Sequence, residues 1–130
     1  TSLRAWHGQH GIEWWGRRED RPAVLQLGHI ACLPSYREGL PKVLLEAAAC
    51  GLPLVTTDAP GCRDVVHDGD NGFLVPIRNA QALALALARL IEDAALRATM
   101  GRRAREIVLA EFSQERIIKE TLAVYLELTP

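Results

Sequence analysis

Two glutamates eight positions apart are the side chains in this sequence best placed to bind a sugar. Glu38 lies in a short polar stretch after Pro34, and Glu46 lies in an apolar run that begins at Pro41. If that run is helical, eight residues extend ~12 Å, about the length from a donor sugar past a diphosphate to a ribose. A carboxylate that accepts hydrogen bonds from neighbouring hydroxyls holds a sugar well. The spacing alone equally fits two glutamates that only face solvent.

The chain between the two glutamates offers backbone donors for a diphosphate. Gly39, Leu40 and Lys42 each have an N–H group near the expected helix start, whereas Pro41 has none. The first amides of a helix lack partners within the helix, and the helix dipole is positive there, so this position favours an anion. Gly39 allows the backbone to approach such a ligand closely.

The elements that position these residues follow an alternation of short apolar runs and helical patterns. That alternation predicts an α/β fold with a parallel sheet. The strands are expected at 11–16, 29–33, 53–57 and 72–76, and the helices at 22–27, 41–50, 79–91, 93–110 and 113–128. Asn79, Asp93 and Ser113 are the expected N-caps of the last three helices. Ligands of open parallel sheets bind beyond the carboxyl ends of the strands, where the loop after residue 33 would lie.

Two surface patterns on the C-terminal helices are interpreted structurally. One face of the helix over 79–91 is expected to pack on the sheet through Leu83, Leu87, Leu90 and Ile91. A basic cluster on the next helix is expected to face solvent rather than bind phosphate, and it consists of Arg102, Arg103 and Arg105.

The composition excludes several classes of protein. The chain has 130 residues, of which 48% are hydrophobic and 24% charged, as in one soluble domain or part of one. Lys and Arg total 15 against 16 Asp and Glu, for a net charge of -1, so nucleic acid is not an expected partner. No run approaches the ~20 apolar residues of a membrane helix.

Cysteines and histidines give no sign of a metal or redox site. Cys32, Cys50 and Cys62 lack CxxC spacing and are expected to be buried free thiols. A nucleophilic Cys62 with His67 as its base is an alternative without a supporting signature. The four histidines show no ligand spacing, so no bound metal is expected.

Several short motifs occur along the chain in a specific order and spacing. They are Pro34-Ser35, Glu38-Gly39, Glu46-Ala47, Gly51-Leu52-Pro53-Leu54-Val55, Gly61-Cys62-Arg63-Asp64-Val65-Val66 and Gly72-Phe73-Leu74-Val75-Pro76. Together they resemble the C-terminal domain of retaining glycosyltransferases of family 4, which have the GT-B fold. The resemblance extends over about residues 11–127 and implies a truncated Rossmann-like parallel sheet with C-terminal helices.

The resemblance also implies roles for individual residues. Glu38 and Glu46 match the E-x7-E signature, in which the first glutamate is catalytic beside the donor sugar and the second binds the nucleotide ribose. The amides of Gly39 and Leu40 are implied to bind donor sugar and diphosphate. The remaining residues expected to bind the donor are Ser35, Lys42 and Gly61. Many members have glycine where this chain has Pro41, and Asp64 fits either a helix cap or a site residue.

The implied activity is transfer of a hexosyl unit, with retention, from a UDP- or GDP-sugar to a glycan or lipid-linked acceptor, as in polysaccharide or lipopolysaccharide biosynthesis. No cofactor is implied. Residues 1–130 are expected to be a partial donor-binding domain, inactive alone because the N-terminal acceptor domain is absent. The protein is expected in the cytoplasm at the inner face of the membrane, with peripheral membrane association. The exposed edge of the strand at 29–33 favours a homodimer.

Two alternatives to a transferase remain. One is a non-catalytic module that binds a nucleotide sugar or assists assembly. The other is a sugar-nucleotide epimerase of the GT-B fold, which the spacing of Glu38 and Glu46 fits less well.

Overall fold

The computed structural model of the chain describes residues 29–34, 39, 41–112 and 115–128. Its sheet has three parallel strands in the order β1-β2-β3, which are β1 (Ala31–Leu33), β2 (Leu54–Thr57) and β3 (Gly72–Val75). The helices are α3 (Lys42–Ala49), α4 (Cys62–Val65), α5 (Ala80–Glu92), α6 (Ala94–Glu111) and α7 (Arg116–Leu128). The predicted α/β class is confirmed.

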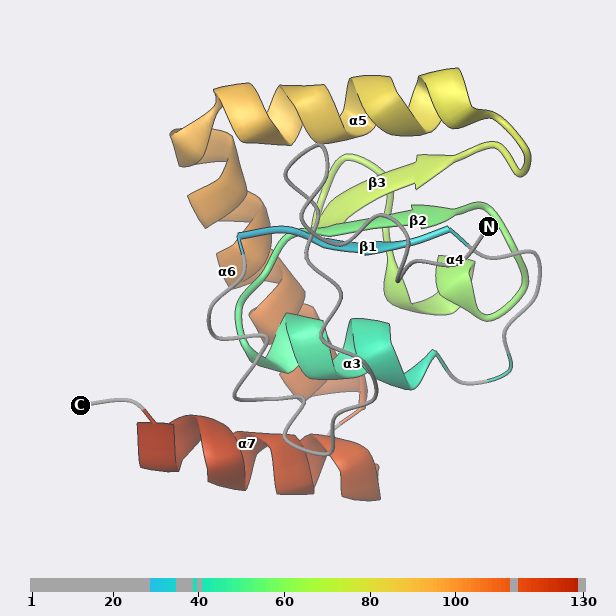
Figure 1. Ribbon diagram of the computed structural model, residues 1–130. Coiled ribbons are helices and arrows are strands. Elements are labelled where there is room, and N and C mark those ends of the chain that lie inside the picture. Colours follow the sequence, from blue (N-terminus) through green and yellow to red (C-terminus); the bar gives the residue numbers. More distant parts are fainter. Residues whose placement is uncertain (1–28, 35–38, 40, 113–114, 129–130) are drawn as a thin grey trace, which may run out of the picture.

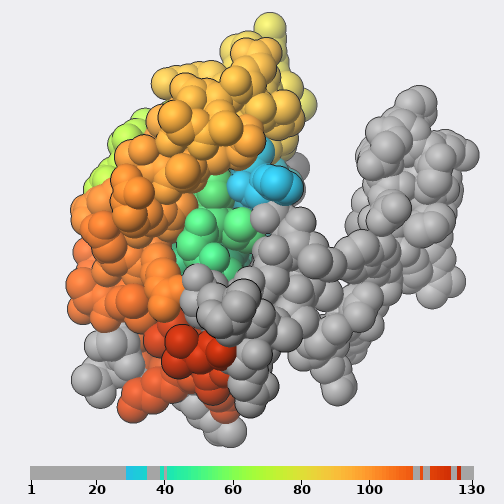
Figure 2. Space-filling view, turned by 90° about the vertical axis from the view of Figure 1, so that its left-hand side faces the viewer, coloured from blue at the N-terminus to red at the C-terminus, as the bar shows by residue number. Residues whose placement is uncertain are grey.

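Helices cover both faces of the sheet (Figure 1). Because side chains alternate along a strand, neighbouring residues of β2 point to opposite faces. Leu54 belongs to the core shared with α3, α6 and α7, whereas Val55 packs with Phe73 of β3 and Leu90 of α5. Figure 2 shows α6, in orange, extending from α5 to α7 and joining the two layers. β2 and β3 are therefore buried on both faces, which explains their nearly continuous apolar sequences.

Most predicted elements within the described residues are confirmed, with ends shifted by one to three residues. The Asn79 side chain accepts a hydrogen bond from the Ala82 amide at 2.9 Å, and Asp93 accepts one from Leu96 at 3.0 Å, so both N-caps are confirmed. The single turn of α4 was not predicted. The strand expected at 11–16, the helix at 22–27 and the cap Ser113 lie outside the described residues.

Two burial predictions are wrong. Ile91 is 65% exposed, because the buried face is centred on Ala86 and Leu90 and a step of about 100° per residue places Ile91 well outside it. Ala86 is buried on that face instead. Cys32 is exposed, since strand alternation turns it to the face opposite Ala31.

The other cysteines and the basic cluster give mixed outcomes. Cys62 is a fully buried free thiol, as predicted, which argues against a role as a nucleophile. Cys50 is half-buried.

Within the basic cluster Arg102 is exposed to solvent, as expected. Arg103 instead contacts Asp70, so the prediction of a purely solvated cluster is wrong for this residue.

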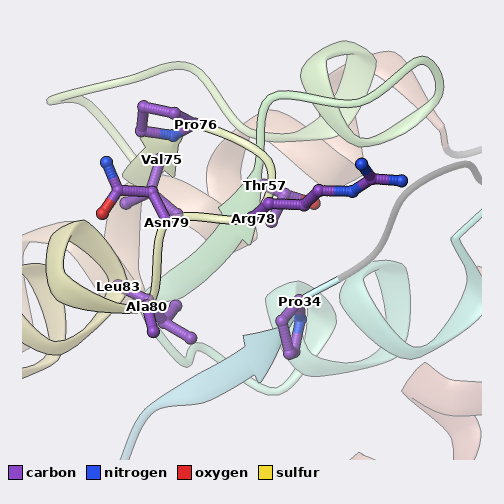
Figure 3. A pocket seen from close by; sticks show the side chains of 8 residues that line it. All are labelled: Pro34, Thr57, Val75, Pro76, Arg78, Asn79, Ala80 and Leu83. Atoms are coloured by element: carbon purple, nitrogen blue, oxygen red, sulfur yellow. The ribbon is translucent and has the colours of Figure 1, made fainter.

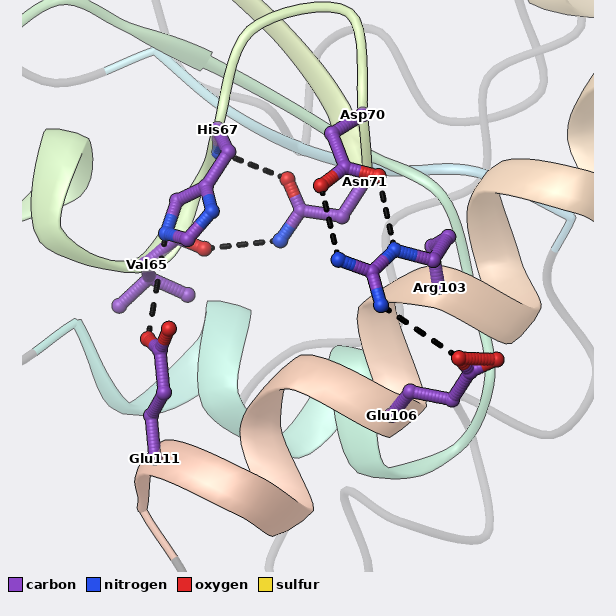
Figure 4. A network of polar contacts seen from close by, with 7 residues as sticks. All are labelled: Val65, His67, Asp70, Asn71, Arg103, Glu106 and Glu111. Carbon is purple, nitrogen blue, oxygen red and sulfur yellow. Dashed lines mark hydrogen bonds and ion pairs between the residues drawn. The ribbon is translucent and has the colours of Figure 1, made fainter.

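Hydrogen bonds hold the turn before β3 against the rest of the molecule (Figure 4). The buried Asn71 side chain accepts from the His67 amide at 2.7 Å and donates to the Val65 carbonyl at 2.8 Å. Two Arg103 nitrogens donate to the two Asp70 oxygens at 2.8 and 3.0 Å. These bonds fix the turn internally and attach it to α6, at the edge of the sheet opposite the strand ends.

The Asp70–Arg103 pair makes stability depend on acid pH. The hydrogen bonds from Arg103 hold the pKa of the Asp70 carboxyl below its usual 3.8. A carboxyl whose pKa is lowered by folding stabilises the protein above its unfolded pKa, and this stabilisation is lost as the pH falls through the folded value. We expect Asp70→Asn to flatten the fall in the free energy of unfolding below about pH 4. Urea unfolding across pH 2–7 measures the free energy of unfolding, and Asp64→Asn, which changes an exposed carboxyl, is the control. If the free energy falls with pH equally steeply in the wild type and in Asp70→Asn, the expectation is contradicted.

A close approach of two backbones positions α3. A Cβ atom at Gly101 of α6 would overlap the Gly51 carbonyl oxygen, directly after the end of α3. Gly51 has φ of +80°, a conformation that glycine adopts without strain. The glycine within α6 therefore lets this helix rest on the carboxyl end of α3 and fixes the direction in which the amino end of α3 points.

Candidate functional site

Three strand ends and the starts of the three helices that follow them lie together at the carboxyl edge of the sheet. All three strands run in the same direction, and the amino ends of α3, α4 and α5 lie at the edge where the strands end (Figure 1). The Thr56 hydroxyl donates to the Leu33 carbonyl at 2.7 Å, which joins the ends of β1 and β2. This is the edge at which parallel sheets of this kind bind ligands.

The first amides of α3 have no hydrogen-bond partner within the helix. Among the described residues no side chain caps it, and its first turn has no acidic residue. The first hydrogen bond of the helix runs from the Leu45 amide to the Pro41 carbonyl at 3.1 Å. The amides of residues 42–44 therefore have no partner within the helix. Lys42 and Gly39 are both exposed, and a Cβ atom at Gly39 would meet nothing within 4 Å. The open approach and the uncapped amides fit the predicted diphosphate contact.

Glu46 lies one turn further along α3 and is only 3% exposed, between the fully buried Leu45 and Ala47. A carboxylate in such surroundings is costly unless polar groups or a ligand compensate it. The alternative in which Glu46 merely faces solvent is therefore wrong. Glu46 lies on the helix that begins at the strand ends, and its predicted contact with a ribose stays a prediction.

Of the other residues of the predicted site, two lie among the described residues and three do not. Gly61 is buried, has φ of +88°, and directly precedes α4 in the loop that follows β2. Asp64 is exposed in the first turn of α4. Ser35, Glu38 and Leu40 lie outside the described residues, so the pairing of the two glutamates stays a prediction.

The sequence did not reveal a pocket of about 300 Å³ at the same edge, on the α5 side of the sheet (Figure 3). We call it the strand-end pocket. Its lining residues are Pro34, Thr57, Val75, Pro76, Arg78, Asn79, Ala80 and Leu83. The sequence did contain one indication of this pocket. Residues 34, 57 and 76 lie at or directly after the ends of three strands, and parallel packing brings those strand ends together.

Within the part of the chain that the structure describes, no three His, Cys, Asp or Glu side chains are grouped to hold a metal ion. No helix there is long and apolar enough to cross a membrane.

Comparisons with solved structures agree with this architecture. HepE of Anabaena, solved in complex with UDP-glucose, superposes with a TM-score of 0.76 at 29% identity, over 90% of this chain and 32% of HepE. The C-terminal domain of a group 1 glycosyl transferase (LpcC) from Francisella tularensis superposes with a TM-score of 0.69 at 26% identity, over 78% of this chain and 52% of that one.

Curated relatives are sugar transferases or synthases. The chain is 31% identical over 119 residues to N-acetyl-alpha-D-glucosaminyl L-malate synthase of Bacillus anthracis, covering 92% of this chain and 31% of that protein. It is 32% identical over 114 residues to N,N'-diacetylbacillosaminyl-diphospho-undecaprenol alpha-1,3-N-acetylgalactosaminyltransferase of Campylobacter jejuni, covering 88% of this chain and 30% of that protein. The chain thus spans about a third of the length of these two relatives.

The family model described as glycosyl transferases group 1 matches residues 3–107, most of the chain. Its match agrees with the parallel sheet, the helices on both faces and the neighbouring GT-B structures. The chain belongs to the group 1 glycosyl transferase family.

Proposed function

We propose that the chain is the donor-binding part of a glycosyltransferase that moves a hexosyl unit, with retention, from a UDP- or GDP-sugar to an acceptor. The observation that carries the proposal is the buried Glu46 on a helix whose uncapped amino end opens at the carboxyl edge of the sheet. The UDP-glucose in HepE, a structural neighbour, supports a nucleotide sugar as the donor.

In this proposal the donor extends along α3. The diphosphate accepts hydrogen bonds from amides at the start of the helix, including those of Gly39, Leu40 and Lys42, in the positive field of the helix dipole. The Glu46 carboxylate accepts hydrogen bonds from the ribose hydroxyls. Glu38 contacts the donor sugar and is the catalytic carboxylate, and no metal or cofactor takes part.

Two further residues complete the donor site in this proposal. Ser35 and Gly61 border the sugar and the diphosphate from the loops after β1 and β2. Gly61 has the buried, left-handed backbone that a close approach to a ligand favours.

The acceptor is proposed to be a glycan or a lipid-linked sugar. The Campylobacter relative is named for a sugar on diphospho-undecaprenol, and another relative is a lipopolysaccharide core transferase of Rhizobium meliloti. We place the protein in the cytoplasm, at the inner face of the membrane, where a lipid-linked acceptor is reached by peripheral association.

The reaction itself is tested by product analysis. Incubation of the protein with UDP- and GDP-hexoses and a lipid-linked acceptor is expected to give a glycosylated acceptor with the α-configuration of the donor. An epimerised nucleotide sugar without transfer would favour the epimerase, and binding without any turnover would favour the non-catalytic module. The 130-residue chain alone is expected to show negligible transfer, and turnover by it would contradict the proposed need for an acceptor domain.

We also propose that two copies of this chain associate through β1. Among the described residues β1 pairs with β2 alone, and neither charge nor proline interrupts Ala31–Leu33. An apolar strand edge of this kind favours pairing with another chain. Light scattering of the purified chain is expected to show dimers or larger species, and a monomer over a wide concentration range would contradict the association.

A further inference from the structure

We propose that Arg63 and Asp58 form a positioning pair for the donor site, because together they hold the loop between β2 and α4 in the shape that presents Gly61 to the nucleotide sugar. We call residues 58–61 the β2–α4 loop. The inference rests on the proposed function, in which Gly61 borders the sugar and the diphosphate. It adds two residues that act on the donor through the loop and do not contact it themselves.

The β2–α4 loop leaves the sheet at the edge where ligands of parallel sheets bind (Figure 1). Its first residue is tied to the neighbouring strand, because the Asp58 amide donates to the Val75 carbonyl of β3 at 2.7 Å. The next residue, Ala59, is fully buried in the core. These contacts fix the point at which the loop leaves the sheet, and Gly61 lies beyond them.

Arg63 of α4 closes the loop from its other end. Its Nη2 donates to the Asp58 carbonyl at 3.1 Å, and its Nε lies 3.0 Å from the Asp58 Oδ1. Its own amide donates to the Ala59 carbonyl at 3.2 Å. The planar guanidinium thus holds the main chain and the side chain of one residue at the same time. Gly61, with φ of +88°, lies between the two residues that are joined, so the bridge spans the residue proposed to meet the donor.

The exposure of the pair indicates that the bridge shapes the loop more than it stabilises the whole fold. The Arg63 and Asp58 side chains are 53% and 56% exposed, and ion pairs with this exposure contribute little to global stability. A glycine loop without such a bridge samples many backbone conformations. A bridge that holds one of them lowers the entropy lost when a ligand binds, because the loop is ordered beforehand.

The opposite charges of the two residues separate positioning from direct contact with the donor. If Arg63 itself bound the diphosphate, Asp58→Ala would free the guanidinium and remove a nearby anion, so donor affinity would rise. Positioning predicts the reverse. Asp58→Ala and Arg63→Ala should each weaken binding about fivefold, and the double variant should bind no more weakly than either, since both changes remove the same bridge. Isothermal titration calorimetry with UDP-glucose and with GDP-mannose measures the affinities.

Conservative variants distinguish the geometry of the bridge from its charge. Asp58→Asn keeps an oxygen that accepts from Nε, so its affinity should stay within about twofold of the wild type. Arg63→Lys keeps the charge but not the paired geometry, and it should recover only part of the affinity. The control is Arg102→Ala, which removes an exposed arginine of α6 and should also stay within about twofold. The melting temperatures of all these variants should lie within about 4 °C of the wild type.

The order of the loop is measured separately, in the absence of any donor. The heteronuclear ¹⁵N NOE of the Gly61 amide, which reports picosecond to nanosecond motion, should fall in Asp58→Ala and in Arg63→Ala, while that of Leu90 in α5 stays unchanged. A Gly61 amide as rigid as in the wild type overturns the inference. Unchanged or increased donor affinity in either variant also overturns it. If the wild type binds neither nucleotide sugar while the variants loosen the loop, the proposed function fails and the ordering of the loop by the bridge is upheld.

Discussion

Glu46→Ala is expected to weaken the binding of the nucleotide-sugar donor ten- to a hundred-fold. A charge-assisted hydrogen bond contributes roughly 1.5–3 kcal/mol, and each ~1.4 kcal/mol changes the dissociation constant tenfold. The substitution removes the carboxylate proposed to hold the ribose, from a position that is only 3% exposed. Calorimetric titration of the protein with UDP- and GDP-sugars measures the loss.

Two further variants separate a direct contact from a folding defect. Glu46→Gln keeps the size and hydrogen-bonding capacity of the side chain, so the fold should survive while affinity falls by a smaller factor. Glu92→Ala removes an exposed glutamate at the end of α5, away from the strand ends, and should leave the donor affinity unchanged. Wild-type affinity in Glu46→Ala would remove the ribose assignment. The companion variant Glu38→Ala should depress turnover more than nucleotide affinity, because its proposed contact is with the sugar.

Gly72→Ala is expected to lower the free energy of unfolding by about 3 kcal/mol. A Cβ atom at this position would overlap the Leu54 carbonyl oxygen, so β3 could keep its register with β2 only if one backbone moved. Both strands are buried on both faces, and close-packed surroundings resist such a shift. Thermal unfolding followed by circular dichroism measures the change.

The matched control for Gly72→Ala is Gly39→Ala. A Cβ atom at Gly39 meets nothing within 4 Å, and its backbone is not in the left-handed region. Its stability should stay within about 0.5 kcal/mol of the wild type. Equal melting temperatures for wild type and Gly72→Ala would show that the two strands adjust freely at this point, contrary to the geometry described above.

The sequence predicted the parts of the fold that depend on local patterns. Apolar runs identified β1, β2 and β3, and side chains able to accept a hydrogen bond at helix starts identified the caps Asn79 and Asp93. Both patterns depend on residues that are close together in the sequence, so long-range packing does not alter them. The single turn of α4 was missed because four residues carry no helical periodicity.

Features that depend on long-range packing were not predictable from one sequence. Arg103 looked like one member of a solvated basic cluster, yet it pairs with Asp70 from a turn 33 positions earlier. Gly101 within α6 had no local explanation until α6 was seen to rest on Gly51. The strand-end pocket likewise combines residues from three strand ends and one helix. Conversely, the spacing of Glu38 and Glu46 fitted solvent-facing glutamates equally well, so the donor site came from the family resemblance; Glu46 is buried, and its role at a ribose stays a prediction.

The measurement that tests the account most directly is mapping of the donor site by nuclear magnetic resonance. Titration of the ¹⁵N-labelled chain with UDP-glucose, and separately with GDP-mannose, should shift the amide signals of Gly39, Lys42 and Gly61 in a saturable way with at least one of them. The signals of Asp70 and Arg103, at the opposite edge of the sheet, should not move. If neither nucleotide sugar perturbs the residues at the start of α3, or if the shifts are confined to the turn before β3, the chain does not bind its donor as proposed.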